Sequence, residues 1–456
     1  MALNDIETFV IVMLENRSFD HACGYLSLPD ADPPMDVDGL RADQAWLDQY
    51  RNDDIDGTPI SIHRLAPNDQ NFIDPPHEDT NIATQIKTPT HDNASPILGG
   101  FVKSYADAIP RPKDRSAVMG YYGKEAVPVF DFFARNFTIC DRWFSSLPAG
   151  TQPNRLMAMG GESKIIHNVG NPLEFPDQPL AYDWLTKNIG DDGWCSYQYG
   201  GVPFFALMKR WFDDIAARRK DPGAGFFRQY SKFAEEWNGD TPLPNVIFIE
   251  PKYTDDPSFT GFKPNDDHCP TGISHGQKFL ADIYNTIVGN AARWKSTALI
   301  VSYDEHGGFF DHVPPMDVPV TAGGEDFTTT GIRVPTFIVS PYVKPGVVYK
   351  EAADATSVLS LLAERFTNNV PYSLEVAARQ QAFKPLGAIF DNAPVTDPPN
   401  EIPKSVIDAL VYTDATAAFS PATPNETAQA FGKTREALLK LHPEYFTEAM
   451  TSSMIG

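Results

Sequence analysis

Short apolar runs recur along the chain, and each of them ends abruptly in polar residues. The clearest runs are residues 9–14, 245–249, 298–301 and 334–339, and a further strand is predicted at 138–144. Continuous apolar runs of this length are typical of strands that are buried on both faces of a parallel sheet. Segments with helical spacing lie between them, so the pattern predicts an α/β fold: a three-layer α/β/α sandwich with a mainly parallel sheet.

Two long segments interrupt this alternation. Residues 26–125 are rich in Pro, Asp and Asn, and residues 162–240 contain clustered aromatic side chains. Long irregular segments in compact folds are usually functional, so we expect them to cover the mouth of a site. We therefore predict a catalytic domain at 1–385 with cap insertions at about 26–125 and 162–240. Residues 386–456 are expected to form a C-terminal extension that packs on the same domain.

Acidic and amide side chains follow two of the predicted strands. Glu15 and Asn16 come directly after the first strand, and Asp304 and Glu305 come after the strand at 298–301. The carboxyl ends of parallel strands meet at one edge of a sheet, where ligands bind. Adjacent carboxylates repel each other unless a cation or a shared proton holds them. Taken alone, Asp304 and Glu305 also fit an ordinary polar turn with a helix-capping acid.

Thr151 is the candidate nucleophile. It follows Gly150 and precedes Pro153, a pattern typical of a helix start, where backbone N–H groups attract anions. Together with the four strand-end residues it forms a set of oxygen ligands for a divalent cation, which would lower the pKa of the hydroxyl and neutralise a phosphoryl group. Such ligands fit calcium, magnesium or manganese, with zinc as a further option. The alternative is that Thr151 only caps the helix.

Several other polar residues are candidates for supporting roles. His77 and His268 lie in polar loops and could donate protons to phosphoryl oxygens or to a leaving group. Arg17 could bind phosphate or form a structural ion pair. His306 and His312 are expected to support the residues that contact the metal.

Four segments of the sequence resemble one known family. Residues 13–21, 151–155, 265–268 and 303–312 are similar to the bacterial and plant non-specific phospholipase C family, which also contains secreted bacterial acid phosphatases. The resemblance covers roughly residues 5 to 370. It implies an alkaline-phosphatase-like sandwich and hydrolysis through a covalent phosphoenzyme.

The resemblance also implies roles for individual residues. It implies that Thr151 is the catalytic nucleophile and that His268 and His77 contact the phosphoryl group. The metal ligands it implies are Glu15, Asn16, Asp304, Glu305 and Thr151. We further expect four residues at the substrate: Arg17, Asn154, Asp267 and Tyr197.

Departures from the family pattern leave the substrate class open. No histidine is found around Ser196–Tyr199, and residues 354–357 read Asp-Ala-Thr-Ser where His-Thr-Ser is more usual. We expect a metal-assisted phosphoric ester hydrolase of the phospholipase C type. The alternatives are an acid phosphatase on small monoesters and a non-catalytic protein braced by a metal. Sulfatase chemistry is disfavoured because Thr151 cannot become formylglycine, and no Gly-x-Ser-x-Gly elbow of a metal-independent esterase is present.

The net charge and the composition restrict the classes of molecule that the protein is expected to bind. The 456-residue chain has a formal net charge of −23, which argues against binding to nucleic acid or to anionic membranes. The expected partner is a phosphate ester or a phospholipid headgroup, without nucleic acid and without integral membrane association. Asp5 and Glu7 precede the first apolar run, so no signal peptide is evident and the protein is expected to be cytoplasmic, or secreted with its leader removed. The four cysteines form no CxxC pair, and neither their disulfide state nor the oligomeric state follows from the sequence.

Overall fold

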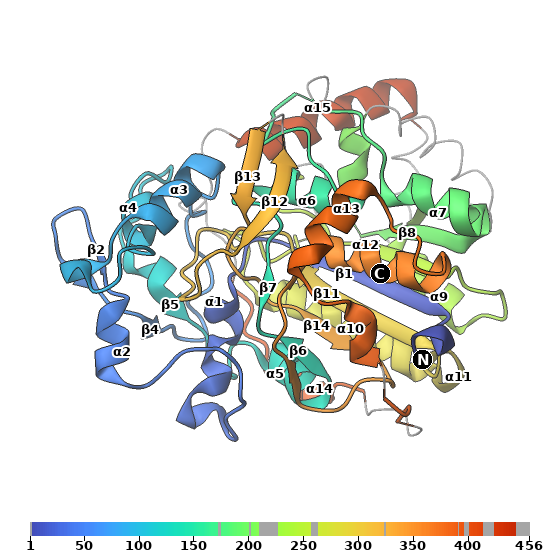
Figure 1. Ribbon diagram of the computed structural model, residues 1–456, viewed down its shortest axis with the longest axis horizontal. Coiled ribbons are helices and arrows are strands. Elements are labelled where there is room, and N and C mark those ends of the chain that lie inside the picture. Colours follow the sequence, from blue (N-terminus) through green and yellow to red (C-terminus); the bar gives the residue numbers. More distant parts are fainter. Residues whose placement is uncertain are drawn as a thin grey trace.

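An eight-stranded sheet forms the centre of the protein (Figure 1). The structure is a computed structural model that describes residues 2–171, 175–199, 202–208, 227–256, 263–322, 325–390, 392–395, 401–413 and 424–443. The strand order is β15-β6-β14-β11-β1-β10-β8-β9. The strands are β1 (Thr8–Leu14), β6 (Thr138–Cys140), β8 (Trp194–Gln198), β9 (Phe227–Gln229), β10 (Val246–Glu250), β11 (Thr297–Tyr303), β14 (Phe337–Val339) and β15 (Val347–Tyr349).

Strand β1 lies in the middle of this sheet. It runs parallel to β10 on one side and to β11 on the other, so that Phe9 pairs with both Val246 and Ala298. Among the described strands of this sheet, only β14 is antiparallel to its two neighbours, β11 and β6. The prediction of a mainly parallel sheet is therefore confirmed. The run at 138–144 is divided: β6 joins the large sheet, and β7 (Trp143–Phe144) pairs with β16 (Ala353–Asp354) in a small one.

Helices cover both faces of the sheet. Phe133 of α5 (Pro128–Asn136) packs on Phe337, which lies in register with Val301 and Val12 across the sheet. Phe9 lies three positions from Val12 and so points to the opposite face, where it meets Phe366 of α12 (Ala355–Phe366). Helices α10 (Ser274–Gly289) and α11 (Ala291–Trp294) share the face of α5, whereas α6 (Thr151–Gly160) and α7 (Ala181–Ile189) share that of α12. This arrangement confirms the expected three-layer α/β/α fold.

Residues 26–125 form a separate group of short elements beside the sheet, coloured blue and cyan in Figure 1. They include α2 (Gln44–Gln49), α3 (Asp79–Lys87) and α4 (Phe101–Tyr105), with the small strand pairs β2–β3 and β4–β5. Gly120 of β5 contacts the residues that follow β1: its carbonyl oxygen lies 2.8 Å from Nδ1 of His21. This hydrogen bond joins the end of the segment to the residues that follow β1.

Residues 162–240 differ from the expected cap, because two of their segments are strands of the central sheet. Strand β8 pairs in parallel with β10, and β9 pairs with β8. Trp194 of β8 stacks on Tyr182 of α7, while Tyr197 packs against Phe233 of α9 (Phe233–Asn238) on the other face. Aromatic residues on both faces conceal the alternation that marks a strand, which explains why the sequence pattern did not indicate it.

The last helix among the described residues is α15 (Glu426–Leu441), capped by Asn425. The expected extension at 386–456 lies partly outside the described residues, which here include η10 (Leu386–Phe390) and α14 (Lys404–Asp408). Among the described residues, no helix has both the length and the apolar content that crossing a membrane requires.

A buried network of charges joins two loops at the carboxyl edge of the sheet. Arg333 donates to Asp311 over 2.9 Å and to Asp20 over 3.1 Å. His312 lies 2.6 Å from the second oxygen of Asp20 and 3.3 Å from Asp38. Burial opposes the charged form of His312, but Asp20 and Asp38 outweigh it and raise its pKa to about 9.

We expect this histidine to make stability depend on pH in a defined window. A pKa raised from its ordinary value of 6.5 to about 9 means that the contribution of His312 is complete below pH 6.5 and is lost as the pH rises through 9. Substitution His312→Gln should lower the free energy of unfolding by about 2 kcal/mol at pH 6, the scale of a buried charged hydrogen bond. Urea denaturation at pH 6, 8 and 10 should show the gap between the two proteins closing; a constant gap contradicts the assignment.

Candidate active site

The polar residues after β1 and β11 meet at the carboxyl edge of the sheet. The backbone N–H of Asn16 donates to Oδ1 of Asp304 over 3.2 Å, and that of Arg17 donates to the carbonyl of Glu305 over 3.2 Å. A Cβ at Gly307 would lie 2.2 Å from the carbonyl oxygen of Asn16, so the two loops touch backbone to backbone. Gly307 has a φ of 64° and Asn16 one of 63°, which only glycine and short polar residues adopt readily. The structure therefore brings together the acids that the sequence analysis grouped.

Arg155 connects helix α6 to these acids. Its Nε lies 3.1 Å from Oε1 of Glu15 and 3.3 Å from Oδ2 of Asp304. The same guanidinium donates to the hydroxyl of Tyr253 over 2.9 Å and is buried. Thr151 begins the helix one turn earlier, about 6 Å along its axis. The helix that carries the candidate nucleophile is thus anchored directly to two predicted metal ligands.

The start of α6 also faces the loop that carries His77. Gly150 is the N-cap, and a Cβ on it would lie 3.2 Å from Oε1 of Glu78, the neighbour of His77. Asn154 closes the turn before the helix: its Oδ1 accepts from the N–H of Leu147 over 2.8 Å, and its Nδ2 donates to the Ala149 carbonyl over 2.7 Å. Thr151 is therefore buried in a turn that Asn154 fixes, and the residue before it faces Glu78.

Two histidines stand near the acids, with ring centres 5.6 Å apart. Nε2 of His77 lies 3.3 Å from Nδ2 of Asn16 and 3.9 Å from Oε1 of Glu305. Nδ1 of His268 lies 3.2 Å from Oε2 of Glu15, and its Nε2 lies 3.2 Å from Oδ2 of Asp74.

Both histidines favour the protonated form. Burial alone would lower the pKa of His77, but Glu305 and Asp74 raise it to about 9. Burial likewise opposes protonation of His268, and its carboxylate neighbours, Asp74 and Asp255 first, bring its pKa well above the ordinary value. Two cationic imidazoles at this edge suit a negatively charged ligand.

The acids themselves are crowded and buried, and this crowding separates their pKa values. Burial raises the pKa of Asp304 well above its ordinary value, and the neighbouring charges of Glu15 and Glu305 add to this effect against the pull of Arg155. Burial acts the same way on Glu15, but there Arg155 and His268 prevail and lower the pKa. Crowded acids of this kind either keep a proton or bind a cation.

The donor set fits a divalent cation. Three buried oxygens accept no hydrogen bond from the residues that the structure describes: Oδ1 of Asn16, Oδ2 of Asp304 and Oε1 of Glu305. Buried polar atoms are nearly always paired, and hard oxygen atoms are what magnesium, calcium and manganese take as ligands. Glu15, Asn16, Asp304 and Glu305 are therefore suited to hold such an ion.

Other expected substrate-binding residues have structural contacts instead. Arg17 donates from Nε and Nη2 to the carbonyl of Asp267, at 3.0 and 2.6 Å. The Asp267 carboxylate accepts from the Tyr303 hydroxyl over 2.6 Å and from the Gly276 N–H over 3.0 Å. Asn154 serves the turn described above. These three residues brace loops around the site rather than present free groups to a ligand.

Tyr197 lies on the face of the sheet opposite α6, where its hydroxyl donates to Glu236 of α9. The structure does not bring it to Thr151. The two histidines that were expected to support the metal ligands lie in different places. His306 lies at the site, 3.4 Å from Glu305 and 2.8 Å from Gln85. His312 belongs to the network around Arg333. His306 is thus placed to orient a ligand, and His312 to hold the loops.

Four residues of the site had no role in the sequence analysis: Arg155, Asp74, Asp255 and Asp266. Arg155 and Asp266 stand inside two of the segments that carry the family resemblance, and Asp74 lies three positions before His77. The positions of Arg155, Asp266 and Asp74 in the sequence could therefore have identified them as site residues. Asp255 follows β10 in a polar stretch with nothing to distinguish it, so only the fold reveals it.

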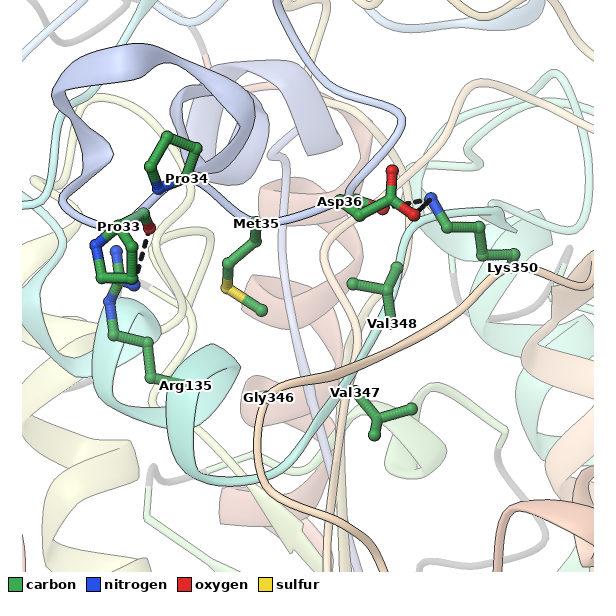
Figure 2. A pocket seen from close by; sticks show the side chains of 9 residues that line it. All are labelled: Pro33, Pro34, Met35, Asp36, Arg135, Gly346, Val347, Val348 and Lys350. Carbon is green, nitrogen blue, oxygen red and sulfur yellow. Dashed lines mark hydrogen bonds and ion pairs between the residues drawn. The ribbon is translucent and has the colours of Figure 1, made fainter.

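A separate surface pocket of about 670 Å³ lies at the edge strand β15 (Figure 2). Val347 and Met35 face it, and its two basic side chains are already paired. Lys350 lies 3.3 Å from Asp36, and Arg135 donates to the carbonyl of Pro33 over 2.9 Å. None of the site residues line it, so the chemistry lies elsewhere.

Comparison with known proteins identifies the family of the chain. The chain combines a mainly parallel α/β sandwich with clustered acids, histidines and a hydroxyl at a helix start. The model of the Phosphoesterase family matches residues 6–370, and the chain belongs to this family. The resemblance seen in the sequence is thereby confirmed.

Relatives of known name are plant and bacterial proteins. The chain is 32% identical over 368 residues to non-specific phospholipase C1 of Arabidopsis thaliana, covering 77% of this chain and 63% of the plant protein. It is 29% identical over 414 residues to phospholipase C B of Mycobacterium tuberculosis (strain H37Rv), covering 81% of this chain and 75% of that protein. The chain thus spans a little under two thirds of the plant relative.

Solved structures resemble the chain more distantly. A protein of the alkaline phosphatase superfamily from Vibrio parahaemolyticus has a TM-score of 0.34 at 14% identity, covering 69% of this chain and 81% of that chain. Murine ectonucleotide pyrophosphatase/phosphodiesterase 5 has a TM-score of 0.32 at 14% identity, covering 56% of this chain and 94% of that chain.

Arg155 provides a test of the buried charge cluster. Substitution Arg155→Met keeps much of the side-chain volume but leaves Glu15 and Asp304 without their cationic partner. Loss of one partner from a buried pair costs about 3–5 kcal/mol. The matched control is Arg64→Met, which removes exposed ion pairs with Asp30 and Glu125 and should cost about 0–1 kcal/mol. Equal losses for the two variants in urea denaturation contradict the assignment.

Proposed function

We propose that the protein is a metal-assisted phosphoric ester hydrolase of the phospholipase C type, which works through a phosphothreonine at Thr151. The observation that carries the proposal is a set of three buried oxygens, on Asn16, Asp304 and Glu305, that accept no hydrogen bond from the described residues and lie beside the helix that Thr151 begins. Membership of the Phosphoesterase family and relatives named as phospholipases C support the same reaction class.

The cation would be held by Glu15, Asn16, Asp304 and Glu305, with the hydroxyl of Thr151 as a further ligand. When bound, it supplies positive charge that lowers the pKa of a hydroxyl and offsets charge on a phosphoryl group. The ligands are oxygens only, a set that calcium, magnesium and manganese share and that zinc tolerates.

The hydroxyl of Thr151 loses its proton to solvent, its oxygen attacks phosphorus, and the bond from phosphorus to the leaving oxygen breaks. The positive end of the α6 dipole lies at this threonine and favours the developing negative charge. The helix has few spare donors, because the N–H of Gln152 already donates to Asn168 over 2.8 Å and Pro153 has none. Most of the stabilisation from the chain therefore falls to the two protonated histidines.

In this proposal, His268 and His77 supply the proton that the leaving alcohol needs. Each is buried and cationic, and each contacts a predicted metal ligand: Glu15 for His268 and Asn16 for His77. A water molecule then takes the place of the alcohol, gives its proton to the same imidazole and releases the phosphate or phosphorylated headgroup from Thr151. The substrate is thus a phosphate ester, with a phospholipid headgroup as the first candidate.

The nucleophile can be tested with a pair of substitutions. Thr151→Val has the same shape but no hydroxyl and should reduce turnover of p-nitrophenyl phosphorylcholine by roughly 10⁴-fold or more, as loss of a nucleophile does elsewhere. Thr151→Ser keeps the hydroxyl and should retain measurable turnover. Mass spectrometry of rapidly quenched wild-type protein should find phosphate on Thr151, and near-normal turnover by Thr151→Val rules this residue out as the nucleophile.

The cation can be tested by chelation. Treatment with EDTA should abolish turnover and lower the melting temperature, because the crowded acids then lose their counter-charge, and added magnesium, manganese, calcium or zinc should restore both. Substitution Asp304→Asn removes one ligand charge and should weaken metal binding about 10–100-fold in calorimetric titration. Recovery of melting temperature without recovery of ester cleavage by any cation indicates a non-catalytic protein braced by the ion.

A further inference from the structure

Helix α15 packs against the site from outside the part of the chain that matches the family. The family match ends at residue 370, whereas α15 spans Glu426–Leu441 and is capped by Asn425. Figure 1 shows this helix, in dark red, on the side of α6. Three of its contacts reach residues that lie next to the candidate catalytic groups.

The first contact joins the cap of α15 to an acid beside His268. Nδ2 of Asn425 lies 3.1 Å from both carboxylate oxygens of Asp255. Oδ1 of the same side chain accepts the N–H of Ala428 over 2.8 Å, which fixes the amide so that its NH₂ group faces Asp255. Oδ2 of Asp255 in turn lies 3.8 Å from Nδ1 of His268. The cap therefore reaches the imidazole through one carboxylate.

Two further contacts hold the helix in place. The hydroxyl of Thr427 lies 3.4 Å from Nε2 of Gln152, the residue after Thr151. The ring of Phe431 stacks on Tyr253 with centres 5.2 Å apart, and the hydroxyl of Tyr253 accepts from Arg155. The helix thus contacts the neighbours of the nucleophile and of the anchoring arginine at the same time.

Asp255 needs such a partner. It is buried among other acids. Carboxylate oxygens of Asp74 and Glu15 each lie 3.2 Å from a ring nitrogen of His268, the same imidazole that Asp255 contacts. Like charges in one site repel, so a carboxylate without a donor would turn away from this cluster. A two-pronged amide donor offsets the repulsion without adding a charge.

We propose that Asn425 is a positioning residue, which holds Asp255 against His268 and so places the group that protonates the leaving alcohol. The proposal rests on the proposed function. Thr151 reacts as the alkoxide, after its hydroxyl proton has passed to solvent. The bond from Oγ1 to phosphorus forms, the bond from phosphorus to the leaving oxygen breaks, and the proton on His268 passes to that oxygen. In the second step, the oxygen of water bonds to phosphorus, the bond from phosphorus to Oγ1 breaks and returns the alkoxide, and one proton of water passes to His268.

A positioning role for the proton donor predicts a dependence on the leaving group. An alkoxide leaves only with a proton, whereas p-nitrophenolate leaves without one. Dihexanoylphosphatidylcholine and p-nitrophenyl phosphorylcholine share the transferred group and differ in the leaving group. For monoesters, glycerol phosphate and p-nitrophenyl phosphate form the matching pair.

The test substitution is Asn425→Asp, in the full-length, metal-loaded protein. Asp caps helices as well as Asn does, so α15 keeps its cap, but Asp255 loses both hydrogen bonds and faces a carboxylate. We expect kcat/KM to fall about tenfold for the alkyl ester, mainly through kcat, and by less than twofold for the nitrophenyl ester. Asn425→Ser caps the helix without adding charge and should show the same difference in a weaker form.

The matched control is Asn290→Asp. Asn290 caps α11, where its side chain accepts from Arg293, and α11 precedes the amino end of β11, at the edge of the sheet away from the site. This control should change neither ester. Equal losses on both esters, or no loss on either, in folded Asn425→Asp and Asn425→Ser overturn the positioning role. Wild-type protein that cleaves neither ester of either pair overturns the proposed function instead.

Discussion

The repulsion between buried acids is the constraint on which the carboxyl edge of the sheet depends. Glu15, Asp304 and Glu305 lie in a space from which water is excluded, and the chain supplies one guanidinium and two imidazoles nearby. A buried charge without a partner costs several kcal/mol, so this cluster is tolerated only because counter-charges surround it. A divalent cation bound between these acids would offset the same repulsion.

The main chain fixes the positions of these acids. The loops after β1 and β11 touch at Gly307 and Asn16, and hydrogen bonds from the backbone hold Asp304 and the carbonyl of Glu305. Arg155 then adds helix α6 to the same unit. The ligands and the candidate nucleophile therefore do not depend on flexible side chains to find each other, which is what a preorganised site requires.

Local patterns in the sequence were sufficient to predict the central strands of the sheet and the acidic residues at their carboxyl ends. Apolar runs identified β1, β10, β11 and β14, and the polar residues directly after β1 and β11 converge as a parallel sheet requires. Strand β8 was missed because its aromatic residues pack on both faces. Arg17 donates to the carbonyl of Asp267, a contact over 250 positions that no local pattern encodes. Asp255 and the cap of α15 meet over 170 positions and were hidden likewise.

The place of β1 in the sheet has a consequence for how the protein is made. Phe9 precedes its partners, Val246 in β10 and Ala298 in β11, by more than 200 positions. An apolar strand with two open edges must therefore wait until these later residues have been synthesised before it can pair. Strands in this condition associate readily with other chains, and long-range parallel pairing is slow. The central strand of the finished sheet is thus the segment that most needs shielding during translation.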